Sequence, residues 1–209
     1  MAKGLETISE LIDSYDLFAR EYATRRTPEK VTLFIAEQLD FFVSQLPTIL
    51  SSTRILDLGS GPGEESSYIK AKFGIVPECI DVSPIMLELC KDKGLHIRKE
   101  DFSSLSDPTG SVTGSFMNFS LLHVSKVEAS KVLKGVHRVL SPGGILQITL
   151  FEGLGEEFEA KTKYSHPRFF AYYQQNELRR LFSEKFEVIR EAKLKNKPKD
   201  ILSITGKAF

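Results

Sequence analysis

The chain has 209 residues, of which 41% are hydrophobic and 27% charged, proportions ordinary for a globular protein with a substantial core. Lys plus Arg and Asp plus Glu number 28 each, so no overall positive charge indicates a nucleic-acid partner. No stretch approaches the roughly 18 apolar residues of a membrane span, and the first ten residues lack the apolar core of a signal peptide. We therefore expect a cytoplasmic protein without a membrane partner, and the balanced charge argues against an RNA substrate without excluding one.

The two cysteines, Cys79 and Cys90, lie in segments that read as a buried strand and a helix. They lack the paired spacings of a zinc site, so we expect free thiols in a reducing compartment and no metal. The N-terminal 1–50 shows helical periodicity at Tyr15, Phe18 and Tyr22 and again over 31–42. We expect this stretch to cover one face of the domain that follows.

From residue 54 onward, short apolar runs alternate with amphipathic segments, which predicts βαβ units and a parallel sheet. The expected helices are 64–73, 84–93, 126–140 and 174–182, with Ser83 as the N-cap of a helix that starts at Pro84. The expected strands are 54–59, 76–81, 95–100, 114–119, 143–151, 186–195 and 201–208. A polar turn too short for a helix joins the last two strands, so they should form an antiparallel hairpin. The fold class is α/β, a doubly wound Rossmann-like seven-stranded sheet that is mostly parallel, with helices on both faces.

The first strand runs into a turn with three glycines, Gly59, Gly61 and Gly63. A dinucleotide fingerprint, G-x-G-x-x-G, would require its third glycine at residue 64, but that residue is Glu64, and Glu65 follows it. These carboxylates could simply complement the dipole of the next helix, but they would also repel a pyrophosphate bound there. The turn therefore favours a ligand that needs close backbone approach and tolerates negative charge. S-adenosylmethionine, with its ammonium and sulfonium, is such a ligand.

Acidic and apolar residues follow the first three strands, where a parallel sheet binds its ligand. Asp81 ends the second strand about 20 residues after the turn, the spacing at which a carboxylate accepts hydrogen bonds from ribose hydroxyls. After the third strand, Asp101 can accept a proton from an adenine amino group, while Phe102 and Met86 can contact the ring. Asp57 is an unusual residue inside a buried strand, and it could orient the glycine turn or face the ligand's ammonium.

Several of these motifs together resemble class I S-adenosylmethionine-dependent methyltransferases of the bacterial small-molecule type. The stretches "ILDLGSGPG", "CIDVSPIMLELC" and "KEDFSSL" are similar to the first three motifs of that family, and "SFMNFSLLHV" and "VHRVLSPGGILQITL" to the next two. The resemblance implies that the three glycines lie alongside the methionyl part of the cofactor, that Asp81 holds the ribose, and that Asp101 with Phe102 holds the adenine. It also places Asn118 near the methyl-donor end, with S-adenosylhomocysteine as the product. Thr113 stands where the family often has an aspartate.

This resemblance divides one methyltransferase domain, 1–209, into four parts. We expect an N-terminal helical lid (1–50), a cofactor-binding core (54–151), an acceptor-side insertion (152–173) and a final helix with the hairpin (174–209). His123 follows the fourth strand, and it is the best candidate for a general base because an unperturbed imidazole titrates near pH 6.5. In the insertion, Tyr172 and Tyr173 could pack against the acceptor and Arg168 could pair with a carboxylate on it, although the aromatics could instead anchor the loop. Tyr15 and Tyr22 on the lid are further candidates for contact with the cofactor or the acceptor.

The sequence thus predicts methyl transfer to a small-molecule acceptor by in-line displacement, in a monomer or homodimer. Two alternatives stay open. An RNA methyltransferase acting on tRNA nucleosides would need a basic surface, for which only a few N-terminal residues and the "KLKNKPK" turn are available. A non-catalytic cofactor-binding protein of the same fold is the other, because a fold does not establish a function. An NAD-linked oxidoreductase is disfavoured by Glu64.

Overall fold

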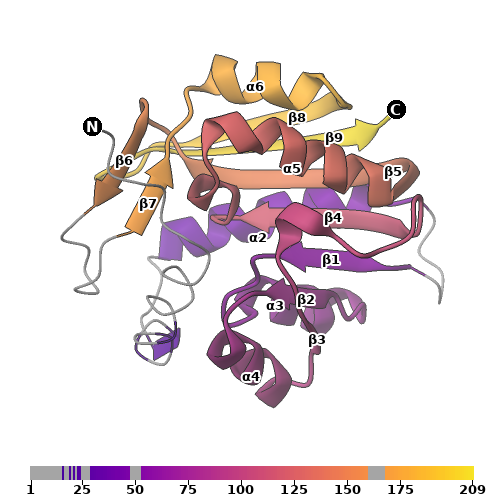
Figure 1. Ribbon diagram of the computed structural model, residues 1–209. Helices are drawn as coiled ribbons and strands as arrows, with labels where there is room; N and C mark the ends of the chain where they lie inside the picture. Colours follow the sequence, from indigo (N-terminus) through magenta and orange to yellow (C-terminus); the bar gives the residue numbers. More distant parts are fainter. Residues whose placement is uncertain are drawn as a thin grey trace.

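The computed structural model describes residues 29–47, 53–159 and 168–209, together with Asp16, Ala19, Glu21, Ala23 and Thr24. A seven-stranded sheet forms its centre, with the order β3-β2-β1-β4-β5-β9-β8 (Figure 1). The strands are β1 (Ile55–Leu58), β2 (Glu78–Asp81), β3 (His96–Lys99), β4 (Val112–Asn118), β5 (Leu140–Phe151), β8 (Phe186–Leu194) and β9 (Ile201–Ala208). Strands β1 to β5 are parallel, and β9 is antiparallel to both β5 and β8. The predicted seven strands and the antiparallel hairpin are confirmed.

Helices cover both faces of the sheet, as expected for a doubly wound fold (Figure 1). One face packs against α5 (Lys126–Val139) and α6 (Gln175–Ser183) through an apolar core that contains Leu58, Met117 and Ile148. The opposite face packs against α2 (Glu29–Gln45) and α3 (Glu64–Phe73). A further helix is α4 (Pro84–Asp92), and two short 3-10 turns are η1 (Phe102–Ser104) and η2 (Leu121–His123).

Local chemistry fixes where these helices begin and end. Ser83 is the N-cap of α4, because its side chain accepts a hydrogen bond from the Met86 amide at 3.1 Å and Pro84 occupies the first helical position. Gly74 ends α3 in a left-handed conformation, and its amide donates to the Lys70 carbonyl. The start of α4 and the end of α3 are thus fixed by local hydrogen bonds.

Two features differ from the sequence-based expectation. Strand β5 begins at Leu140, whereas the sequence predicted a helix to residue 140 and a strand only from residue 143, and its pairing with β4 shifts register between Val112 and Gly114. Within the insertion, β6 (Glu156–Glu159) pairs antiparallel with β7 (Arg168–Ala171) to form a small second sheet. The sequence "EEFE" of β6 carries no alternation of apolar residues long enough to predict a strand, and cross-strand pairing supplies what the local pattern lacks.

Candidate functional site

The glycine turn after β1 has the left-handed backbone that glycine tolerates. Gly59, Gly61 and Gly63 have φ values of 73°, 50° and 78°. A Cβ atom on Gly59 would lie 2.4 Å from the Cβ of Ser120, and one on Gly63 would lie 2.8 Å from the Cys90 sulfur. A Cβ on Gly61 would meet nothing within 4 Å. The outer glycines therefore allow close packing beneath the turn, while Gly61 leaves an open backbone surface above it.

Asp81 joins this turn to the end of β2. One carboxylate oxygen accepts a hydrogen bond from the Gly61 amide at 2.9 Å, and the other accepts from the Ser83 amide at 2.9 Å. Burial raises the pKa of Asp81, and the backbone amides that donate to the carboxylate oppose this rise. An ionised carboxylate has about four lone-pair sites, so two further donors can still bind. Asp81 therefore fits the predicted role of receiving two ribose hydroxyls.

Asp57 lies beneath the turn and is buried, with 2% of its surface exposed. The Ser66 hydroxyl, in the first turn of α3, donates to it at 2.7 Å. Burial, the nearby Cys79 and the charge of Glu65 raise its pKa well above the ordinary value of an aspartate. This hydrogen bond joins the start of α3 to β1, and a role of Asp57 in orienting the turn stays a prediction. Contact with the ammonium of a ligand stays a prediction.

The residues predicted to contact adenine lie on two different elements. Asp101 accepts hydrogen bonds from both the amide and the hydroxyl of Ser103, at 2.8 and 2.7 Å, and so caps η1. The ring of Phe102 lies beside the glycine turn, because its Cε1 atom is 3.3 Å from the position of a Cβ on Gly59. Met86, a residue of α4, is buried, with 1% of its surface exposed. The structure thus brings Phe102 to the turn, and the adenine contacts of Asp101 and Met86 stay predictions.

The end of β4 approaches the same turn. The Oδ1 atom of Asn118 accepts a hydrogen bond from Nε2 of Gln147 on β5 at 3.2 Å. Phe119 follows with a φ of 56°, a left-handed conformation that is uncommon for a bulky residue and concentrates at functional sites. The hydroxyl of Ser120 then donates to the Leu58 carbonyl at 2.5 Å, which joins this loop to β1.

Sequence reasoning missed Phe119, Ser120 and Gln147. A polar amide inside the apolar run "ILQITLF" is a signal that could have singled out Gln147, since a buried strand places a side chain there without water. Nothing in the sequence indicates the conformation of Phe119, because the tertiary contacts around it decide its backbone angles.

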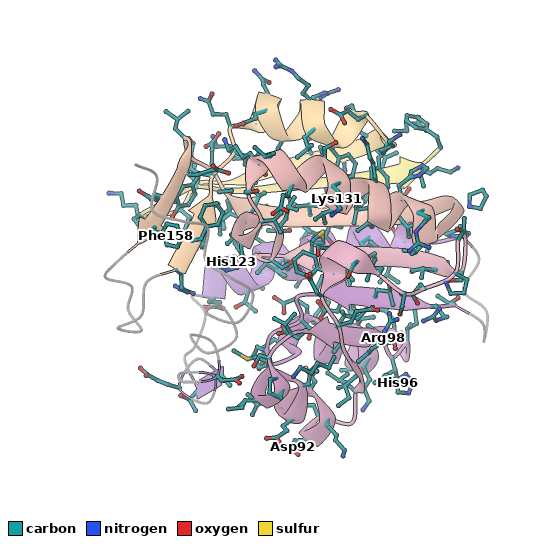
Figure 2. The ribbon with its side chains drawn as sticks, in the orientation of Figure 1. Asp92, His96, Arg98, His123, Lys131 and Phe158 are labelled. Carbon is teal, nitrogen blue, oxygen red and sulfur yellow. The ribbon has the colours of Figure 1, made fainter. Side chains whose placement is uncertain are left out.

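His123 ends η2 and lies close to β7 (Figure 2). Its Nδ1 atom is 2.8 Å from the carbonyl oxygen of Phe169, and its ring centroid is 5.1 Å from that of Phe170. Since a carbonyl can only accept, Nδ1 carries the proton and donates it. Burial and the nearby charge of Arg168 lower the pKa of His123 to about 4. The imidazole is therefore neutral at pH 7, and its role as a general base stays a prediction.

The candidate residues of the insertion are mostly packed among one another. The guanidinium carbon of Arg168 lies 5.0 Å from the ring centroid of Phe170, and the ring of Tyr172 stacks on the same phenylalanine at 5.7 Å. Tyr172 and Tyr173 are 2% and 1% exposed, and the ammonium of Lys126 lies 4.9 Å from the Tyr173 ring centroid. These contacts attach the insertion to the core of the domain. They agree with the alternative that its aromatic residues anchor the loop. Contact of Arg168, Tyr172 or Tyr173 with an acceptor stays a prediction.

The N-terminal stretch reaches this site at one described residue. Asp16 accepts a hydrogen bond from the hydroxyl of Ser83, whose own amide donates to Asp81. Sequence reasoning did not single out Asp16, since a carboxylate on a helix is normally read as a solvated charge. Tyr15 and Tyr22 lie outside the described residues.

The "KLKNKPK" stretch, residues 193–199, contains the turn between β8 and β9. Carboxylates pair with three of its four lysines. Lys195 lies 2.8 Å from Asp200, Lys199 lies 3.1 Å from Glu157, and Lys193 pairs with Glu152. These pairs neutralise much of the positive charge that an RNA-binding surface would need. Among the residues that the structure describes, no group of His, Cys, Asp and Glu could hold a metal, and no helix is long and apolar enough to cross a membrane.

Comparisons with known proteins agree with this geometry. Residues 55–144 match the family described as a methyltransferase domain. No curated protein sequence matches this chain.

Solved structures share the fold at low sequence identity. One similar structure is a 1,6-didemethyltoxoflavin-N1-methyltransferase from Burkholderia thailandensis, with that compound and S-adenosylhomocysteine bound; it is 18% identical with a TM-score of 0.76, over 100% of this chain and 93% of that one. Another is an S-adenosylmethionine-dependent methyltransferase from Methanosarcina mazei, 22% identical with a TM-score of 0.66, over 77% of this chain and 94% of that one. A third is the [4+2]-cyclase SpnF, 15% identical with a TM-score of 0.76, over 99% of this chain and 97% of that one.

The glycine turn, the carboxylate of Asp81 and the strand order therefore coincide with a matched methyltransferase domain and with a fold known from S-adenosylmethionine-dependent enzymes. Residues 55–144 of the chain thus match a methyltransferase domain, and the chain shares its fold with solved S-adenosylmethionine-dependent methyltransferases.

Proposed function

We propose that this enzyme transfers the methyl group of S-adenosylmethionine to a small-molecule acceptor by in-line displacement. One observation carries the proposal: Asp81 holds the open Gly61 backbone by a hydrogen bond of 2.9 Å, at the edge where β1 and β2 end. A Cβ on Gly61 would meet nothing within 4 Å, so the backbone can approach a ligand closely, while the carboxylate is ready for ribose hydroxyls.

When bound, the cofactor supplies an electrophilic methyl group, and the protein supplies position and exclusion of water. In this proposal the glycine turn holds the methionyl part, Asp81 orients the ribose, and Phe102 contacts the adenine from beside the turn. A general base is required only for an acceptor that is protonated at neutral pH. His123 is the candidate there, because its neutral ring can accept a proton at its second nitrogen.

A small acceptor is favoured over RNA by the balance of charge. Three lysines at the β8–β9 turn, Lys193, Lys195 and Lys199, are paired with carboxylates, and the chain as a whole has a net charge of zero. The similar Burkholderia thailandensis enzyme was crystallised with a small heterocyclic compound, which supports the same choice by analogy. A gel shift with tRNA at low salt tests the alternative directly.

A second candidate function is favoured by one comparison. The chain shares its fold with a protein named as a [4+2]-cyclase, so the fold can serve a reaction that is not methyl transfer. Under this alternative, the protein binds the cofactor and methylates none of the acceptors offered to it.

The first experiment is a calorimetric titration with S-adenosylhomocysteine, followed by a methyl-transfer screen with labelled S-adenosylmethionine over phenols, carboxylates and ring nitrogens. We expect binding to the wild type, and a loss of at least tenfold in affinity for Asp81→Asn, because the new amide group can accept from only one of the Gly61 and Ser83 N–H groups and sets a donor against the other. Asp92→Asn changes an exposed aspartate on α4 (Figure 2) and should have no effect. Failure of the wild type to bind would overturn the proposal, and binding without methylation would favour the second candidate.

A further inference from the structure

A row of buried polar side chains crosses the sheet on its α2 face. Phe116, Ile145 and Ile201 pack in the apolar cluster that contains α2, and side chains two or four residues further along the same strands point to the same face. Those side chains are uncharged and lie on β4, β5 and β9: Asn118, Gln147, Thr149, Ser203 and Thr205. All but Asn118 are at most 3% exposed.

The hydrogen bonds within this row have a definite direction. Nε2 of Gln147 donates both to Oδ1 of Asn118 at 3.2 Å and to the hydroxyl of Thr149 at 3.0 Å. The Thr149 hydroxyl then donates to the Ser203 hydroxyl at 3.2 Å. Both hydrogens of the Gln147 amide are therefore used, and the oxygen of Asn118 is fixed as an acceptor. Nδ2 of Asn118 is left buried, with no hydrogen-bond partner among the residues that the structure describes.

Asn118, which carries this amide nitrogen, stands at the end of β4 next to the glycine turn. Strands β1 and β4 pair with Asp57 opposite Phe116, and continuing that register by two residues places Asn118 opposite Gly59. The hydrogen bond of 2.5 Å from the Ser120 hydroxyl to the Leu58 carbonyl keeps the two chains together beyond the strand ends. The free donor of Asn118 is thus at the place where the methionyl part of the cofactor is expected.

The chemistry of that part selects its partner. An N–H donor needs a lone pair, and neither the ammonium nor the alkylated sulfonium is a hydrogen-bond acceptor. The carboxylate is the methionyl group that accepts. We propose that Gln147 is a positioning residue, which holds the Asn118 amide so that Nδ2 donates to the methionyl carboxylate of the bound cofactor. This inference rests on the proposed function.

The test compares two ligands that differ in the methionyl part alone. S-adenosylhomocysteine carries the carboxylate, whereas 5′-methylthioadenosine keeps the adenosine and the sulfur and lacks the amino acid end. For Gln147→Met, which keeps the shape and removes the donor, we expect about tenfold weaker binding of S-adenosylhomocysteine and unchanged binding of 5′-methylthioadenosine. Asn118→Asp should weaken S-adenosylhomocysteine by a larger factor, because it sets a second carboxylate against the first.

Thr205→Val is the matched control. Thr205 pairs with Gln147 across β5 and β9 and is 1% exposed, and within the described part of the chain its hydroxyl has no hydrogen-bond partner. This substitution should leave the affinities of both ligands unchanged. Thermal unfolding of each variant checks that it folds, and if Gln147→Met does not fold, Asn118→Asp carries the test.

The ratio of the two affinities decides the outcome. Equal weakening of both ligands by Gln147→Met or Asn118→Asp would assign these residues a merely structural role and overturn the inference. Unchanged binding of S-adenosylhomocysteine would also overturn it, while leaving the proposed function intact. If the wild type binds neither ligand, the proposed function itself is wrong.

Discussion

The stability of the turn after β1 depends on single glycines. In Gly59→Ala, the new methyl group would lie 2.4 Å from the Cβ of Ser120, on a backbone with φ of 73°. We expect a loss of about 1–3 kcal/mol in the free energy of unfolding, from overpacking and left-handed strain together, and loss of S-adenosylhomocysteine binding. Urea denaturation and calorimetry measure the two effects.

Gly110→Ala is the control for this prediction. Gly110 has a similar φ of 71°, but a Cβ there would meet nothing within 4 Å. It should show the backbone strain alone and keep its affinity for the ligand. Equal effects of the two substitutions on binding would contradict the assigned packing role of Gly59.

The pKa of His123 makes a prediction about stability as a function of pH. Its pKa is about 4 in the folded protein and near the ordinary 6.5 in the unfolded chain. Between these values the unfolded chain binds more protons, so the contribution of His123 is complete above pH 6.5 and is lost as the pH falls through 4. His123→Gln should flatten the fall in unfolding free energy between pH 6.5 and 4. His96→Gln, on the exposed edge strand β3 (Figure 2), should leave the slope as it is.

At the scale of elements, one buried carboxylate joins strands at the edge opposite the site. Asp107 lies 2.9 Å from Arg54, next to β1, and 2.7 Å from Arg98 on β3, and its side chain is 2% exposed. Burial raises the pKa of Asp107, but hydrogen bonds from Arg98 and Arg54 outweigh this and hold it below its usual value.

Asp107→Ala removes hydrogen bonds to two arginines, but Glu78 still pairs with both of them, so we expect a loss of about 1.5–3 kcal/mol in the free energy of unfolding. Asp40→Ala breaks the pair with Lys72, in which the carboxylate is 39% exposed, and should cost at most about 1 kcal/mol. Chemical denaturation of both variants measures the difference. A loss as small for Asp107 as for Asp40 would show that the network contributes little.

Elements with a strong local pattern could be predicted from the sequence. Helix α3 runs over the predicted 64–73, and Ser83 caps α4 as its position before a proline indicated. Strands β6 and β7 could not be predicted, because each is stabilised by its pairing with the other. Asp16 was missed for a related reason: its partner Ser83 lies 67 residues away, and no local periodicity reports such a contact.

At the scale of the whole molecule, the alternation of short apolar runs with amphipathic segments predicted the sheet, which the structure confirms. The sequence carried less information about what surrounds the glycine turn. The direction of the Gln147 amide and the left-handed Phe119 depend on neighbouring strands. They follow from the packed structure, so residue types and spacing cannot supply them.

The place of β9 in the sheet constrains how the protein folds. This strand follows every other described strand in the chain, yet it lies between β5 and β8. Strand β8 is therefore synthesised before β9 but joins the sheet only by pairing with β9. The contact between Thr149 and Ser203 likewise joins residues 54 positions apart in the chain. Such distant pairing is slow, because loop closure precedes the contacts that reward it. Until β9 docks, β5 is left as an open sheet edge, which makes this edge the most exposed to aggregation during synthesis.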